Sequence, residues 1–185
     1  FFNNTVEEEI TFNLKRNKVN NEEIKIKLNE ILEKLGIDKK LLDASPFEIS
    51  GGQKRMIALA SVLISSPKIL FLDEPTAGLD FESKKIFMSS LKSLNKNFKL
   101  TIIQSSHILE DIIEYGDTVL ILNKNKKFIN GNPRDLLFSK ETLNNYGLKE
   151  PEIYKYIEEL KKFGVKNIDN IKTNSELIKK LFYNN

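Results

Sequence analysis

Apolar residues return at helical spacing in two segments of the first third of the chain. The first segment follows Asn20 and Glu23, which have the spacing of a capping box, and it ends at Gly36. Its apolar positions are Ile24, Leu28, Ile31, Leu32 and Leu35. The pattern predicts an amphipathic helix whose apolar stripe packs on another element.

The second segment begins at Ser50 and offers an apolar face for that packing. Its apolar positions are Met56, Ile57, Ala60, Leu63 and Ile64. We expect this helix to end at Ser65, Ser66 and Pro67, because the residue before a proline disfavours helical backbone.

Downstream, short apolar runs alternate with helical patterns. The expected order is strand 69–72, helix 81–94, strand 100–103, helix 108–115 and strand 118–122. This alternation implies parallel pairing and right-handed crossovers. The first strand is apolar on both faces, so it should lie inside a sheet that is covered on both sides.

The last third of the chain is expected to be a hairpin followed by helices. Residues 123–127 form a polar turn in which Asn125 can adopt the left-handed conformation, and this turn should join two strands. Beyond Pro133 the chain turns helical, with amphipathic helices expected over 152–163 and 175–182.

The composition is that of a soluble globular protein. The 185 residues are 40% hydrophobic and 30% charged, and the net charge of +3 is spread without blocks of like charge, so no nucleic-acid partner is predicted. The absence of cysteine excludes disulfides and thiolate metal sites. The longest nearly continuous apolar stretch, 56–64, is far shorter than the roughly 20 residues that cross a bilayer.

Two segments carry candidate chemistry. At 50–53 a serine stands at a helix N-cap and a glutamine at the third helical position, so that backbone N–H groups at the helix tip face an anion. Asp73 and Glu74 follow an apolar strand at its C-terminal end, where open α/β sheets bind ligands. Taken alone, the first could be a loose turn and the second a solvated turn. Together they predict a phosphate site and a magnesium site.

With two further segments, these motifs resemble those of ABC-type ATPases. The matching segments are 50–53 for the signature, Asp73 and Glu74 for the Walker B motif, 76–80 for the D-loop and His107 for the switch histidine. The resemblance implies an α/β fold, a partial P-loop NTPase domain with a mostly parallel sheet, a helical signature subdomain and a C-terminal helical extension.

The resemblance also implies a division of the chain. Residues 1–66 would be part of the ATPase core and the helical signature subdomain. Residues 67–137 would be the α/β core with the Walker B motif, the D-loop and the switch histidine. Residues 138–185 would be the helical extension.

ATP and Mg²⁺ are the ligands that the resemblance implies. Asp73 would orient the metal, usually through a water, and Glu74 would be the general base or polariser of the attacking water. His107 would sense the third phosphate, and Asp80 in the D-loop would link two opposed sites across a dimer. The residues that would meet the ATP of a partner subunit are Ser50, Gly51, Gly52 and Gln53.

Structural alternatives exist for two of these residues. His107 is the only histidine of the chain, and a lone histidine is often structural. Asp80 can cap the helix that begins at Phe81, a role that is compatible with its role in the D-loop.

A finer resemblance is to the ATPase subunits of energy-coupling factor (ECF) importers of vitamins and metals. It rests on the segments 5–10, 45–48 and 147–154, and the segment 45–48 favours the second of two paralogous subunits. The implied partners are a second ABC ATPase subunit, a transmembrane coupling subunit and a substrate-binding membrane subunit. The implied location is the cytoplasmic side of the cell membrane.

The phosphate loop of the family, Gly-x-x-x-x-Gly-Lys-Ser/Thr, does not occur in the sequence, which begins with Phe1. We therefore expect the chain to be the C-terminal part of an ATPase subunit and to be unable to hydrolyse ATP by itself. An alternative is a native shortened subunit that lends its signature to a partner ATPase. An ABC ATPase of DNA repair or chromosome maintenance is disfavoured, because neither coiled-coil arms nor zinc ligands are seen.

Overall fold

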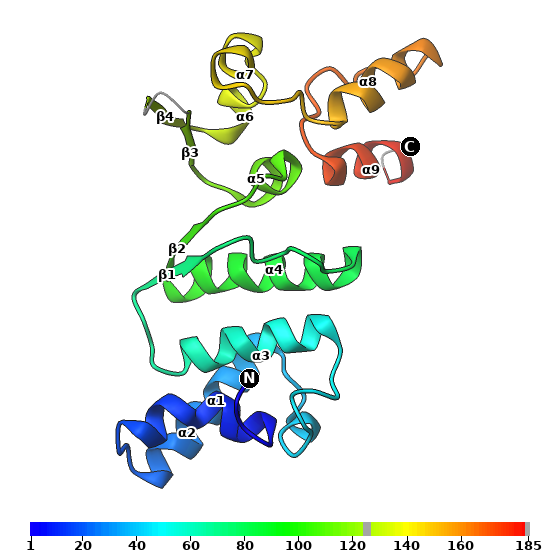
Figure 1. The fold of residues 1–185 in the computed structure, drawn as a ribbon. Coiled ribbons are helices and arrows are strands. Elements are labelled where there is room, and N and C mark those ends of the chain that lie inside the picture. Colours follow the sequence, from blue (N-terminus) through cyan, green and yellow to red (C-terminus); the bar gives the residue numbers. More distant parts are fainter. Residues whose placement is uncertain (124–126, 184–185) are drawn as a thin grey trace. The chain divides into compact units, whose positions relative to one another are not determined.

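The computed structural model describes residues 1–123 and 127–183, and its helices and strands are labelled in Figure 1. The chain divides into two compact units, residues 1–105 and 106–185. The domain boundaries expected near residues 66 and 137 stay predictions. Within the described residues, no helix has the combination of length and apolar character that crossing a membrane requires.

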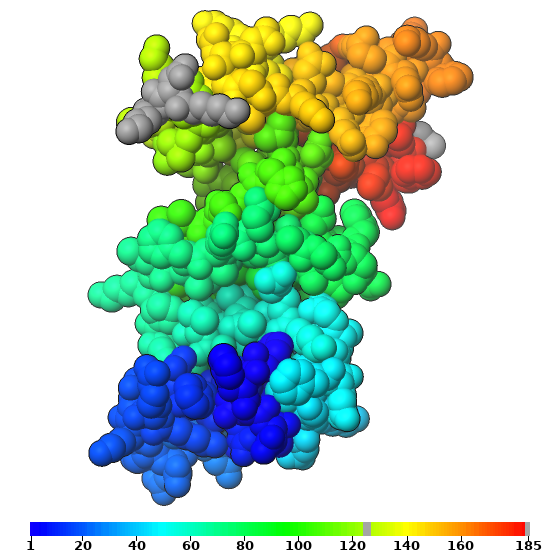
Figure 2. Space-filling model, viewed as in Figure 1, coloured from blue at the N-terminus to red at the C-terminus, as the bar shows by residue number. Residues whose placement is uncertain are grey.

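The first unit opens with a helix that is absent from the predicted elements, α1 (Val6–Arg16). Thr5 caps it by accepting a backbone hydrogen bond at 3.2 Å. Val6, Ile10 and Leu14 are four residues apart and are all buried, which places them on one face of the helix. This face packs against α3, and Figure 2 shows the blue residues of α1 beside the cyan residues around α3.

The two helices predicted for the first third of the chain are confirmed. α2 (Asn21–Leu35) is capped by Asn20 and ends at Gly36, whose φ of 64° lies in the left-handed region that glycine adopts without strain. A short 3-10 helix, η1 (Lys39–Leu41), precedes α3 (Gly51–Leu63). The predicted apolar positions of α2 are all buried, and those of α3 are buried except Met56. α2 packs against both α1 and α3.

The predicted parallel strand pair is also present. β1 (Ile69–Leu72) pairs with β2 (Thr101–Gln104), and α4 (Phe81–Phe98) forms the connection between them. The register runs from Ile69 opposite Thr101 to Leu72 opposite Gln104. Because the strands are parallel and in register, their carboxyl ends lie at the same edge of the sheet, and the residues that follow them are neighbours.

The expectation that β1 is covered on both faces is wrong for the residues that the structure describes. Successive side chains of a strand point to opposite faces, and the buried face is the one that carries Leu70. Helix α4 contacts β2 (Figure 1). On the other face, Ile69, Phe71 and Ile103 are 52%, 72% and 49% exposed. An apolar sequence therefore does not ensure that both faces of this strand are covered.

The second unit contains one helix, a hairpin and a series of further helices. These elements are α5 (Leu109–Tyr115), β3 (Val119–Leu122), β4 (Phe128–Gly131), α6 (Pro133–Leu136), α7 (Lys140–Tyr146), α8 (Ile153–Lys162) and α9 (Asn174–Phe182). β3 and β4 pair antiparallel, which confirms the hairpin, whereas Asn125 of its predicted turn lies outside the described residues. The expected parallel pairing thus holds for β1 and β2, and β3 belongs to a separate two-stranded sheet.

Two apolar clusters form the interior of the second unit. The first joins α5 to the hairpin through Ile113, Val119, Ile121 and Leu137. The second joins the C-terminal helices through Ile153, Ile157, Ile168 and Leu177. Phe138 packs against both clusters, and its carbonyl accepts a hydrogen bond of 2.8 Å from the Tyr154 hydroxyl. The C-terminal helices are therefore anchored to the hairpin end of their own unit.

A polar network fixes the start of α9. The Glu176 carboxylate accepts a hydrogen bond from the backbone N–H of Lys172 at 2.9 Å and forms an ion pair with Arg134 at 2.7 Å. The backbone N–H of Glu176 donates to the side chain of the N-cap residue Thr173. Burial alone would raise the pKa of Glu176. The backbone N–H of Lys172 and the Arg134 guanidinium outweigh burial and hold this pKa below its usual value.

Stability at acid pH should therefore depend on Glu176. A carboxyl with a lowered folded pKa stabilises the fold above its unfolded pKa of about 4.3, and the contribution is lost as the pH falls through the folded value. We expect Glu176→Gln to cost about 1 kcal/mol at pH 7, a modest value because Glu176 is partly exposed to screening solvent. The cost should shrink towards zero near pH 3, as measured by calorimetric melting over a pH series. A matched control is Glu158→Gln, which removes only an exposed contact with Lys161; an equal, pH-independent loss in both variants would contradict the prediction.

Candidate functional site

The tip of α3 is built as the sequence predicts. Ser50 is the N-cap, and its Oγ accepts from the N–H of Gln53 at 3.2 Å. The side chain of Gln53 forms the reciprocal hydrogen bond, in which its Oε1 accepts from the N–H of Ser50 at 2.9 Å. This reciprocal pair fixes the first turn of the helix. The N–H of Gln53 is thereby occupied, whereas the N–H groups of Gly51 and Gly52 have no acceptor in a preceding helical turn and lie at the positive end of the helix dipole, which favours an anion.

The second glycine of this segment lies against the start of α4. A Cβ atom on Gly52 would be 2.5 Å from Ser83 Oγ and 2.9 Å from Ser83 Cβ, both closer than real contacts allow. For Gly51 no atom lies within 4 Å of the same position. The two adjacent glycines therefore differ: Gly52 is required for close packing, whereas Gly51 leaves open space at the helix tip.

A second contact ties α3 to the turn before α4. Arg55 donates from Nη2 to the carbonyl oxygen of Ala77 at 3.1 Å. In that turn the N–H of Ala77 donates to the carbonyl of Glu74 at 3.1 Å, and Gly78 adopts a φ of 75° that a side chain would strain. The helix that begins at the predicted signature segment is thus tied to the predicted D-loop within the first unit.

Asp80 caps α4, so its structural role is confirmed. Its two carboxylate oxygens accept from Ser83, one from the backbone N–H at 2.9 Å and the other from the hydroxyl at 2.7 Å. These hydrogen bonds lower the pKa of Asp80. The side chain is exposed, and its predicted role in linking two opposed sites stays a prediction.

The predicted acid pair stands at the carboxyl edge of the parallel sheet. Asp73 Oδ1 accepts a hydrogen bond of 2.5 Å from the hydroxyl of Ser105, which follows β2. The same hydroxyl oxygen accepts from the N–H of Glu74 at 3.0 Å. Glu74 has a φ of 43°, a left-handed conformation that costs a residue with a side chain about 1–2 kcal/mol. The buried Pro75 follows directly.

His107 belongs to the second unit, in the segment between β2 and α5. The hydroxyl of Ser106, directly before it, accepts from the N–H of Ile108 at 3.1 Å. The acid pair belongs to the first unit, so the role of His107 as the switch residue beside that pair stays a prediction.

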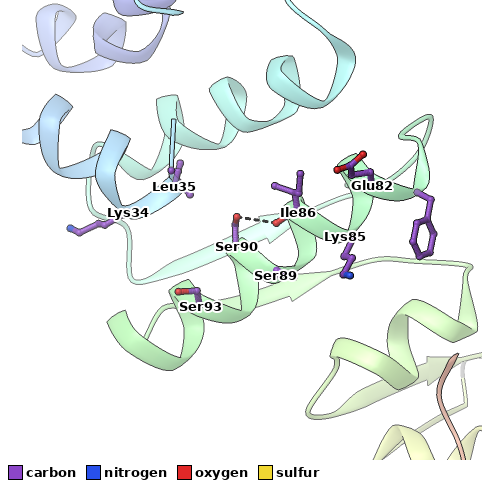
Figure 3. Close-up of a pocket in the computed structure, with 10 residues that line it drawn as sticks. Lys34, Leu35, Glu82, Lys85, Ile86, Ser89, Ser90 and Ser93 are labelled. Atoms are coloured by element: carbon purple, nitrogen blue, oxygen red, sulfur yellow. Dashed lines mark hydrogen bonds between the residues drawn. The ribbon is translucent and has the colours of Figure 1, made fainter. Parts of the chain in front are cut away.

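A cleft of about 780 Å³ lies between the end of α2 and the exposed side of α4 (Figure 3). Its lining includes Lys34 and Leu35 from α2 and, along α4, Lys85, Ser89 and Ser93. None of the residues predicted to bind nucleotide or metal lines it. Because Ser50, Gln53 and Asp73 are exposed, the candidate site is an open sheet edge and helix tip.

Sequence patterns miss three residues of this arrangement: Ser83, Arg55 and Ser105. Each acts through a partner more than twenty positions away in the chain, so local periodicity carries no signal for them. Ser105 could have been found from topology, because it follows β2 as Asp73 follows β1, and parallel strands bring such positions together.

Comparisons with known proteins agree with this geometry. A family model described as ABC transporter matches residues 2–77, which include the tip of α3 and the acid pair. The energy-coupling factor transporter ATP-binding protein EcfA2 of Caldanaerobacter subterraneus subsp. tengcongensis is 41% identical over 164 residues, which are 89% of this chain and 57% of the relative. The EcfA2 protein of Clostridium tetani is 36% identical over 97% of this chain and 63% of its own length.

A solved structure is similar to this chain in both fold and sequence. The cbiO1 protein from Clostridium perfringens, described as part of the ABC transporter complex cbiONQ, has a TM-score of 0.70 and 33% identity, covering 85% of this chain and 62% of that one. The chain is similar to ATP-binding proteins of the ABC transporter family. Among these proteins, it is similar over most of its length to ATP-binding proteins of energy-coupling factor transporters, and it spans about 60% of their length.

Proposed function

We propose that the complete protein is the ATP-hydrolysing subunit of an ECF-type ABC importer and powers uptake of a vitamin or a metal ion through a membrane partner. The observation that carries this proposal is the pair Asp73 and Glu74, held by Ser105 at the carboxyl edge of a parallel sheet. A carboxylate pair at this edge is suited to metal and water chemistry. The names of the relatives support the same class.

Glu74 is assigned the role of general base or polariser of the attacking water, and Asp73 that of the metal ligand. Mg²⁺ takes one or two carboxylates, substrate phosphates and several waters, so it does not need a dedicated cage of side chains. The exposed carboxylate of Asp73 fits this donor set, and no cluster of three or more candidate ligands occurs among residues 1–123 and 127–183. When bound, Mg²⁺ neutralises negative charge on the phosphates.

The tip of α3 is assigned to ATP held mainly by a second ATPase subunit. Ser50, Gly51, Gly52 and Gln53 would meet the terminal phosphate, with exposed Gly51 leaving room for close approach. Asp80 would link the two sites of the dimer, and His107 would respond to the third phosphate. Each site is then shared between two chains, so closure of the dimer and hydrolysis are coupled.

The further partners in this proposal are a transmembrane coupling subunit and a substrate-binding membrane subunit. The protein would lie on the cytoplasmic side of the cell membrane as a peripheral subunit. The solved relative that is described as part of a transporter complex supports such an assembly.

The proposal is tested on the full-length subunit purified with its membrane partners in lipid. We expect release of inorganic phosphate from ATP that depends on Mg²⁺, together with ATP-dependent uptake of substrate into vesicles. A complex that neither binds nor cleaves ATP would refute the proposed function. Hydrolysis that occurs only at the site of the companion ATPase would instead favour a non-catalytic subunit that lends its signature segment.

A further inference from the structure

Ser105 makes three hydrogen bonds to three consecutive residues at the end of β1. Its backbone N–H donates to the carbonyl oxygen of Leu72 at 2.9 Å, which extends the parallel ladder by one step. Its hydroxyl donates to Asp73 at 2.5 Å and accepts from the N–H of Glu74 at 3.0 Å. The first bond needs only the backbone, whereas the other two need the side chain.

Both side-chain bonds act on the groups that the proposed function requires. The bond to Asp73 joins a hydroxyl to a carboxylate, and bonds to ionised acceptors are about twice as strong as those between neutral groups. The bond from Glu74 holds the backbone of a residue that is in the left-handed region, with a φ of 43°. That conformation persists only where surrounding contacts maintain it. One hydroxyl therefore restrains the side chain of one acid and the backbone of the other.

We propose that Ser105 is a positioning residue for ATP hydrolysis: its hydroxyl sets the orientation of Asp73 towards the metal and the backbone conformation of Glu74 towards the water. The inference rests on the proposed function. In this proposal Ser105 contacts neither the nucleotide nor the metal and acts only through Asp73 and Glu74. Only serine and threonine can fill this position, because the side chain must donate and accept through one atom at the length of a single Cβ–O bond.

A purely structural role, as the last rung of the ladder, predicts a different outcome. The backbone bond to Leu72 survives any replacement except proline, so the ladder is unchanged when the side chain is varied. Valine and threonine have the same shape and differ in the hydroxyl. The pair S105T and S105V therefore separates the effect of the hydroxyl from the effect of side-chain size.

The test uses the full-length subunit in its complex and compares the variants S105T, S105V and S105A with wild type. The measured quantities are kcat and KM for ATP and the Mg²⁺ concentration that gives the half-maximal rate. We expect S105V and S105A to lose about tenfold or more in kcat, with KM changed less than about twofold and with a severalfold higher Mg²⁺ requirement. S105T should stay within about threefold of wild type. The control S90A removes a serine hydroxyl that bonds only within α4, to the carbonyl of Ile86, and should match wild type.

A second readout does not depend on turnover. In the absence of nucleotide, amide-hydrogen exchange at Glu74 should be at least about fivefold faster in S105V than in S105T, because the acceptor for this N–H is lost. Equal exchange and equal kcat in S105T and S105V would overturn the inference, and so would an equal loss of activity in both. If the wild-type complex hydrolyses no ATP, the proposed function fails and the role of Ser105 fails with it. If wild type and S105V hydrolyse ATP equally well, only the role of Ser105 fails.

Discussion

Replacing Glu74 by glutamine in the full-length subunit should reduce ATP hydrolysis by about 10²- to 10⁴-fold, the usual contribution of a positioned general base. The amide has nearly the shape of the carboxylate but cannot take a proton from water. Nucleotide affinity should change little, because Glu74 is assigned to the attacking water and not to a phosphate. The measurement is single-turnover phosphate release together with equilibrium ATP binding, so that chemistry and binding are read separately.

The control for this variant is Glu82→Gln, which removes the same charge from an exposed position in the first turn of α4. It should hydrolyse ATP at the wild-type rate. The companion ATPase must carry a disabled site in all these complexes, because its own turnover would hide the loss. Wild-type hydrolysis by the Glu74→Gln subunit in such a complex would contradict the role of Glu74 as base or polariser.

Gly52→Ala should destabilise the fold although alanine is a better helix former than glycine. The added Cβ would lie 2.5 Å from Ser83 Oγ and 2.9 Å from Ser83 Cβ, so α3 and α4 must move apart. Overpacking of this kind costs about 1–3 kcal/mol. The same glycine is assigned to phosphate contact, and a shift of the helix tip should also lower activity. Thermal melting and phosphate release of the full-length subunit would record the two effects.

The neighbouring glycine provides a matched control. A Cβ on Gly51 meets no atom within 4 Å, so Gly51→Ala should be neutral or stabilising by up to about 1 kcal/mol in a melting experiment. The clash can also be relieved from the other side by Ser83→Gly, which removes both close atoms and leaves Ser83 Cα 3.8 Å away. In that background Gly52→Ala should cost at least about 1 kcal/mol less. Equal costs of Gly52→Ala in the two backgrounds would show that packing against Ser83 is not the cause.

Local signals in the sequence were sufficient to predict most helices and the parts of the site that lie on one segment. The caps at Asn20 and Ser50, the stop at Gly36 and the apolar spacing of α2 and α3 are all present as predicted. They could be predicted because capping and helical periodicity act over a few residues. The acid pair was placed correctly at a strand end for the same reason, since a short apolar run followed by polar residues marks a strand and its edge.

The contacts between distant segments could not be predicted in this way. Gly52 against Ser83 and Asp73 against Ser105 join positions about thirty residues apart, and they depend on how α3, α4 and β2 pack. The exposed face of the sheet could not be predicted for the same reason. Phe71 is apolar, yet its exposure depends on whether another element covers that face. His107 was assigned by its place after an apolar strand, and the fold of each unit alone does not test that assignment.

The alignment of the two short parallel strands has a chemical consequence of its own. Only four residues of β1 lie opposite four of β2, and Ser105 reaches the acids because it follows the last of these pairs. If β2 slid by a single residue, every side chain on it would turn to the opposite face, and the serine hydroxyl would point away from the Asp73 carboxylate and from the N–H of Glu74. A register shift of one residue would keep the strand pair but remove the contacts between the Ser105 side chain and the acid pair. The register of β1 and β2 is thus as necessary to the proposed reaction as the acids themselves.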